Sequence, residues 1–172
     1  WVDYFIEVCF GPNGLTGFYQ TWAFDEMFSS SIVSLFDLDE NGIFSEDEIE
    51  EVRHGVFEYL VEYDYFTHIK IDGRDFTIPH ARDFNAFIDG HHVVYEFFLP
   101  CELPVAATPR TLHVLVGDME YYADMTLASE GLRIRGNESV SVSYSFGTGS
   151  AFSFYGGAWE PEHLTLRFEK AS

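Results

Sequence analysis

A twelve-residue segment, residues 37–48, constrains the fold more than any other part of the sequence. Oxygen-bearing side chains recur there at alternate positions, a glycine stands at the sixth position and a glutamate at the twelfth. This is the spacing of an EF-hand loop, which surrounds a calcium ion with about six to eight oxygen ligands. The predicted metal ligands, one of them a backbone carbonyl at the seventh position, are Asp37, Asp39, Asn41, Ile43, Ser45 and Glu48.

Both flanks of this loop have the apolar spacing of amphipathic helices. Apolar residues fall at positions 28, 32, 35 and 36 before the loop, and at 49, 52, 56, 57, 60 and 61 after it. Ser45 and Glu48 also fit a capping box at the start of the second helix, which is compatible with their roles as ligands. No second segment repeats the loop pattern, and Phe44 is free to dock on a sheet. The sequence therefore predicts a lone EF-hand whose calcium ion is structural, holding two helices on the rest of the fold.

Most of the remaining sequence alternates apolar and polar residues, as half-buried strands do. The dipeptides Asp72-Gly73 and Asp89-Gly90 are typical of hairpin turns between such strands. We therefore expect an α+β fold that is mainly β, with an antiparallel β-sandwich-like body and an inserted EF-hand helix-loop-helix. The predicted strands are residues 2–10, 15–24, 67–71, 76–78, 83–88, 93–99, 112–116, 121–127, 132–135, 140–146, 152–155 and 164–168.

Three prolines, Pro100, Pro104 and Pro109, precede Thr111 and predict a linker or crossover there, because proline cannot donate a hydrogen bond to a sheet. Residues 1–110 would then hold a hairpin, the EF-hand and a β meander. Residues 111–172 would form a β-rich C-terminal part, either continuous with the first or a second small domain.

Charge and composition restrict the classes of partner. The chain has 172 residues, of which 29 are Asp or Glu and only 9 are Lys or Arg, giving a formal net charge of -20. Such a charge repels nucleic acid phosphates, so no nucleic acid partner is expected. Hydrophobic residues make up 47% of the chain, enough for a buried core. No run approaches the roughly 18 apolar residues of a membrane span, so the chain is not expected to be membrane-embedded.

The cysteines and the first residues bear on the compartment. Cys9 and Cys101 are either joined in a disulfide bond, as in an exported protein, or are two unpaired thiols; the sequence leaves both alternatives open. The sequence starts at Trp1 inside a strand pattern and without Met, as a mature exported chain or a trimmed fragment does.

Other constellations give weaker indications. His91 and His92 suggest a transition-metal site, but neighbouring residues of a strand point to opposite faces and no third ligand has suitable spacing. No motif for a nucleophile, a phosphate loop or a catalytic zinc occurs, so we do not expect an enzyme. Four aromatic residues would form either a sugar-binding platform or part of the core: Tyr121, Tyr122, Tyr155 and Trp159.

An ordered series of short segments resembles a bacterial family, DUF1007, described as periplasmic components of an uncharacterised ABC-type transport system. The resemblance covers about residues 1–128 and is looser beyond. It rests on Thr21-Trp22-Ala23-Phe24-Asp25-Glu26-Met27-Phe28, on Tyr65-Phe66-Thr67 followed by Asp72-Gly73, on Asp83-Phe84 and Leu99-Pro100, and on Asp118 with Tyr121-Tyr122.

This resemblance implies export to the periplasm, an EF-hand within a β-rich domain, and association with nickel, cobalt or zinc transport. Members of the family tend to begin with a His-Pro-His segment, which is missing before Trp1, so the resemblance does not extend to a metal site built on that segment. We therefore expect a calcium-binding, exported accessory factor in metal-ion transport, whose partners are calcium and either a transition-metal ion or a membrane transporter. The alternative is a calcium-stabilised glycan-binding module.

Overall fold

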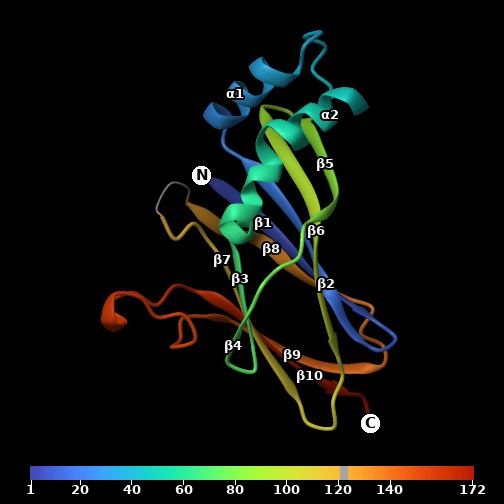
Figure 1. The fold of residues 1–172 in the computed structure, drawn as a ribbon, viewed down its shortest axis with the longest axis vertical. Helices are drawn as coiled ribbons and strands as arrows, with labels where there is room; N and C mark the ends of the chain where they lie inside the picture. Colours follow the sequence, from blue (N-terminus) through green and yellow to red (C-terminus); the bar gives the residue numbers. More distant parts are fainter. Residues whose placement is uncertain (121–123) are drawn as a thin grey trace.

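The computed structural model describes residues 1–120 and 124–172. Within these residues, ten strands form two five-stranded sheets, in the orders β5-β6-β2-β1-β8 and β4-β3-β7-β10-β9. Two helices, α1 and α2, are inserted between β2 and β3. They cover one end of the elongated molecule, whereas β9, β10 and the C-terminus lie toward the other end (Figure 1).

The first sheet contains the N-terminal hairpin, and all but one of its strand pairs are antiparallel. The exception is β8, which runs parallel to β1 at the edge of the sheet. Alternate side chains are buried from Val2 to Val8 of β1 and from Phe18 to Phe24 of β2, as the period of two predicts. Its strands are β1 (Val2–Gly11), β2 (Gly14–Phe24), β5 (Arg82–Asp89), β6 (His92–Pro104) and β8 (Met125–Arg135).

The second sheet is antiparallel throughout its described strand pairs. The turn between β3 and β4 is Asp72-Gly73, as predicted, and both of its residues have positive φ, at 49° and 84°. The strands are β3 (Thr67–Ile71), β4 (Arg74–Phe76), β7 (Arg110–Val116), β9 (Val140–Gly147) and β10 (His163–Lys170).

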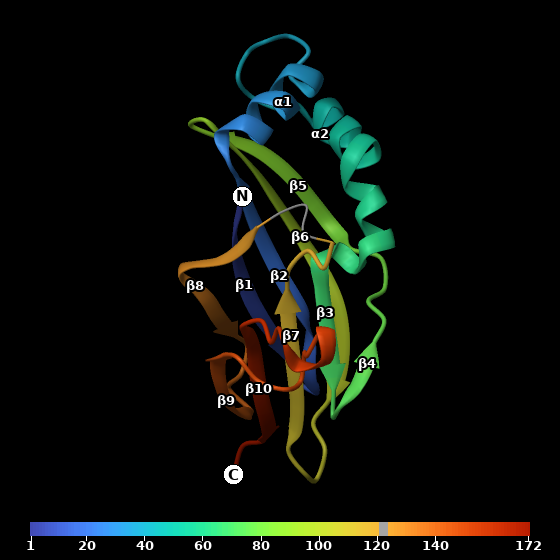
Figure 2. The same ribbon diagram turned by 90° about the vertical axis from the view of Figure 1, so that its left-hand side faces the viewer.

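The helical insertion occupies the two segments predicted from apolar spacing. Helix α1 (Glu26–Phe36) begins after Asp25, whose side chain accepts a hydrogen bond from the Phe28 N–H. Helix α2 (Glu46–Val52) continues as a π-helical turn, η1 (Arg53–Phe57), and a 3-10 segment, η2 (Glu58–Phe66). Figure 2 shows this continuous path descending beside β5 and β6.

The core of the protein lies between the two sheets. The rings of Phe10 on β1 and Phe168 on β10 meet edge to face, with centroids 5.2 Å apart. A buried polar chain also joins the sheets: the Trp22 indole donates to Gln20 Oε1 at 2.9 Å, and Gln20 Nε2 donates to Thr67 Oγ1 at 2.8 Å. Burial of these polar groups costs little free energy because each has a hydrogen-bond partner. The two hydrogen bonds therefore help to fix the relative position of the sheets.

The structure corrects three expectations about the strands. The expected strand 76–78 is displaced, because β4 ends at Phe76 and residues 77 and 78 lie outside it. Strand β8 pairs with β1 in parallel, although an antiparallel sheet was expected. Over its described range β8 also joins the expected strands 121–127 and 132–135 into one strand. The register of its pairing with β1 shifts between Tyr4 and Ile6. Residues 152–155 are not a strand but a single bridge from Phe154 to Trp159 and a 3-10 turn, η3 (Tyr155–Gly157). Gly156 and Gly157 both have positive φ, which turns the chain away from an extended path.

The expected linker or crossover before Thr111 is confined to residues 105–109, which connect β6 of the first sheet to β7 of the second. Strand β6 runs through Pro100 to Pro104 and stays paired with β2. The pairing of β5 with β6 ends at Phe98, so β6 has only one neighbour beyond this point and the prolines leave no ladder bond unmade.

The two cysteines are free and lie on opposite faces of the same sheet. Cys101 is fully buried in the core between the sheets, whereas Cys9 lies on the outer face, where Arg135 Nη2 donates to its sulfur at 3.6 Å. Strand β2 also separates their strands, which places them two strand spacings, roughly 10 Å, apart. This distance exceeds the limit of about 7 Å between the Cα atoms of a disulfide. Of the two alternatives, the structure has the unpaired thiols.

In the described part of the chain, no helix is both long enough and apolar enough to cross a membrane.

Candidate metal centre

Three carboxylates of residues 37–48 converge between α1 and α2. Asp37, Asp39 and Glu48 each offer one oxygen, and these oxygens lie within 4.8 Å of one another. Asp37 and Glu48 are both only 6% exposed, although Asp and Glu are rarely buried without a partner. Among the described residues, this group could hold a metal ion, because a cation placed between the oxygens would offset their mutual repulsion.

Backbone N–H groups of the loop orient the first of these carboxylates. Asp37 ends α1, and its Oδ2 accepts from the Gly42 N–H at 2.9 Å while Oδ1 accepts from the Asn41 N–H at 3.2 Å. Gly42 has φ of 78°, a conformation that glycine adopts without strain, and a Cβ there would meet no atom within 4 Å. Glycine is therefore needed for the turn itself and not for lack of space.

Glu48 closes the loop from the other side. Its Oε1 accepts from the Leu38 N–H at 2.9 Å and its Oε2 accepts from the Ser45 N–H at 2.8 Å, so both ends of the loop are tied to one carboxylate. The bond from Ser45 is the main cause that lowers the pKa of Glu48, and the charge of Asp37 acts in the opposite direction. Each carboxylate oxygen retains a second lone pair that can bind a metal ion.

The remaining predicted ligands, Asn41, Ile43 and Ser45, form hydrogen bonds within the same loop. The Asn41 amide donates to Asp39 Oδ2 at 2.9 Å, and its Oδ1 accepts from the Ile43 N–H at 2.8 Å. The Ser45 hydroxyl accepts from the Glu48 N–H at 3.2 Å, which completes the predicted capping box. The sequence reading missed the backbone N–H of Leu38, since backbone donors have no sequence signal of their own.

The loop is fixed to the β body by apolar and polar contacts. Phe44, in the middle of the loop, is 6% exposed and belongs to the same core cluster as Ile32 of α1 and Val52 of α2. Ser29 of α1 accepts a hydrogen bond from the Val93 N–H of β6 at 2.8 Å. The two helices therefore rest on the β5-β6 edge of the first sheet, and the loop stands at the end of the molecule.

The other candidate residues lie elsewhere. His92 Nδ1 donates to the Phe24 carbonyl at 2.7 Å, and His91 is exposed in the neighbouring turn; neither belongs to a convergent group in the described part of the chain. Of the four aromatic residues, Tyr121 and Tyr122 lie outside the described residues. Tyr155 is 69% exposed on η3, and Trp159 is half-buried four residues later, where it lines a cavity.

Fold and site together define a two-sheet β protein with a helical insertion that presents an acidic, potentially metal-binding group. Residues 1–143 match the family described as "Protein of unknown function (DUF1007)", and the chain belongs to this family. It is also similar to an "Uncharacterized 15.5 kDa protein in trpE 3'region" of Spirochaeta aurantia. The two are 28% identical over 132 residues, which cover 76% of this chain and 93% of the relative.

Proposed function

We propose that residues 37–48 bind calcium as an EF-hand loop, and that the ion stabilises the attachment of α1 and α2 to the β body. The observation that carries this proposal is the convergence of Asp37, Asp39 and Glu48 within 4.8 Å. Carboxylate oxygens on a flexible loop are the donors that calcium prefers, whereas zinc and copper favour imidazole and thiolate.

A structural role is favoured over a sensor role by the packing of the loop. A sensor hand opens to expose an apolar groove when calcium binds. Here Phe44, Ile32 and Val52 are already buried in the core shared with the sheets. Opening the hand would expose these side chains and disturb the β body, so calcium is expected to hold the insertion closed.

For the biological task, we propose an exported, periplasmic accessory factor in metal-ion transport. This step rests on the resemblance to a family described as periplasmic transport components. A test is the titration of nickel, cobalt and zinc into the mature protein isolated from its source, with calcium present. Tight binding of one of them supports the role, and binding of none of them contradicts it.

Calcium binding itself is tested by isothermal calorimetry on Glu48→Gln, with Glu46→Gln as the matched control. Glu46 is an exposed carboxylate in the same helical turn and is not among the convergent oxygens. The first change removes both a charge and the bidentate ligand, so we expect calcium affinity to fall by about 100-fold or more, whereas the control should bind nearly as wild type does. Equal affinity of the two variants would contradict the assignment.

A further inference from the structure

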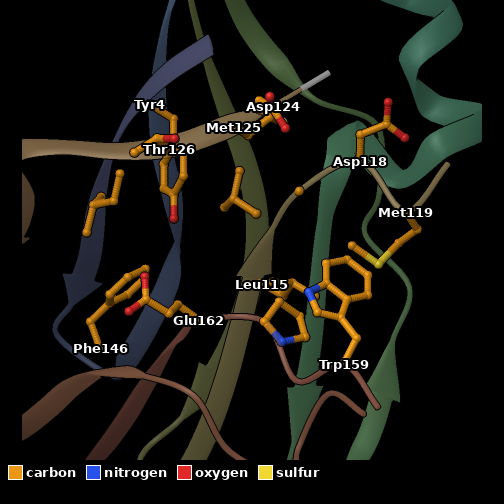
Figure 3. Close-up of a pocket in the computed structure, with 14 residues that line it drawn as sticks. Tyr4, Leu115, Asp118, Met119, Asp124, Met125, Thr126, Phe146, Trp159 and Glu162 are labelled. Carbon is orange, nitrogen blue, oxygen red and sulfur yellow. The ribbon is translucent and has the colours of Figure 1, made fainter. Parts of the chain in front are cut away.

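A cavity of about 370 Å³ lies between the two sheets, away from residues 37–48. Strands β1 and β8 form one wall, the end of β7 forms another, and the segment 159–162 closes a third side. Figure 3 shows the ring of Tyr4 pointing from β1 toward Phe146 and Glu162, with Met119 and Trp159 on the other side of the space. The volume suits a small organic molecule.

The Tyr4 hydroxyl is a polar group without a partner at this cavity. Tyr4 is 4% exposed, and its hydroxyl forms no hydrogen bond with any of the residues that the structure describes. Burial, together with the negative charge of Glu162, raises the pKa of this phenol above its ordinary value. The hydroxyl opens on the cavity, where a polar group of a ligand could form a hydrogen bond with it.

All formal charge at the cavity is negative. Asp118, Asp124 and Glu162 line it, and no Lys, Arg or His is found among its described lining residues. Asp124 and Glu162 form no salt bridge with the described residues. The potential in this space therefore attracts cations and repels anions.

The walls between these carboxylates are apolar and polarisable. Tyr4, Phe146 and Trp159 supply aromatic rings, and Met119 and Met125 supply thioethers. Ring faces attract a cation that has little bound water, and methionines adapt to the shape of an apolar ligand. A small hydrated metal ion would gain little from such walls, but an ammonium group that carries methyl or methylene groups matches both the charge and the walls.

From this combination we infer that the cavity binds a small organic cation, an ammonium with apolar substituents. A neutral sugar could donate hydrogen bonds to the carboxylates of the lining, but it would leave their negative charge uncompensated, whereas an ammonium group offsets that charge. The inference is independent of calcium binding at residues 37–48, since no residue of that loop lines the cavity.

The test uses choline and its neutral isostere 3,3-dimethylbutan-1-ol, titrated calorimetrically into the protein saturated with calcium. The two molecules have nearly the same shape, so a difference in affinity reports the charge. We expect choline or the diamine 1,5-diaminopentane to bind, and the isostere to bind about tenfold more weakly or less. Binding of neither cation, equal binding of the isostere, or binding of glucose instead would overturn the inference.

Matched variants locate the site. Glu162→Gln should weaken the binding of the cation about tenfold, whereas Glu160→Gln, an exposed carboxylate two residues away and outside the cavity, should leave it unchanged. Tyr4→Phe removes only the hydroxyl and should weaken choline binding several-fold. Urea midpoints of the variants check that each remains folded, and equal affinity of Glu162→Gln and Glu160→Gln would place the site elsewhere.

Discussion

The loop of residues 37–48 and the cavity beside Tyr4 are both acidic, yet they are built in opposite ways. The loop takes all of its oxygens from twelve consecutive residues, and its own backbone N–H groups hold them in place. The cavity gathers carboxylates from positions 118, 124 and 162 around aromatic walls that come from both sheets. Hard oxygens held close together suit a small bare cation, whereas spread carboxylates and rings suit a larger organic one.

The largest effect is expected from a change that damages the body on which both regions depend. Trp22 is 1% exposed, contacts Phe97 with ring centroids 4.8 Å apart and donates to Gln20. Trp22→Ala should lower the free energy of unfolding by about 3–5 kcal/mol, because it leaves a cavity and breaks the polar chain between the sheets. Urea unfolding measures this loss.

The comparison is sharpened by a second tryptophan. Trp159 is half-buried at the wall of the cavity. Trp159→Ala should therefore lower the free energy of unfolding by less than Trp22→Ala does, and it should leave calcium binding intact. If Trp22→Ala were no more destabilising than Trp159→Ala, the sheets would not form the shared core described above.

A smaller effect is expected from the helix cap within the loop. Ser45→Ala removes the acceptor for the Glu48 N–H and should destabilise the protein by about 1 kcal/mol while lowering calcium affinity. Ser30→Ala, at an exposed position of α1, serves as the control and should change stability by less than about 0.5 kcal/mol. Binding of choline should be the same in both variants, and a loss of choline binding in Ser45→Ala would show that the two regions are coupled.

An effect that grows with pH is expected in alkaline solution, from the core that separates the two regions. Burial raises the pKa of the Cys101 thiol from 9.0 to about 12. The unfolded thiol ionises first, so its contribution to stability is complete below pH 9.0 and is lost as the pH rises toward about 12. Urea midpoints between these two pH values should fall with pH, and less steeply in Cys101→Ala. Equal slopes, or rapid alkylation of Cys101 in the native protein at pH 8, would contradict its burial.

The contrast between the two regions also explains what the sequence could predict. The helical flanks, the capping box of Ser45 and Glu48, and the convergence of three of the proposed ligands follow from local spacing, because the interacting groups are close in sequence. The strands β1, β2 and β3 and the Asp72-Gly73 turn were likewise predictable from local pattern.

The remaining features depend on contacts between distant residues, which have no signal in a single sequence. The parallel pairing of β8 with β1 joins residues more than 120 positions apart, and it places Met125 and Thr126 beside Val2 and Asp3. The same pairing helps to form the cavity, so neither Tyr4 nor Glu162 stood out beforehand. Pro100 is tolerated in β6 only because β5 ends its pairing at Phe98, a fact of sheet order and not of composition.

The most direct test of the central claim is a thermal melt with calcium and with EDTA, alongside titration of a dye that binds apolar surface. Calcium at about 100 times its Kd should add roughly 2.7 kcal/mol and raise the Tm by several degrees, because the ion binds the folded state alone. Dye binding should stay nearly constant, since Phe44 and its neighbours are buried already. In Glu48→Gln the melts with and without calcium should coincide. If calcium instead leaves the Tm of the wild-type protein unchanged and strongly raises dye binding, the loop is a switch and the structural role is wrong.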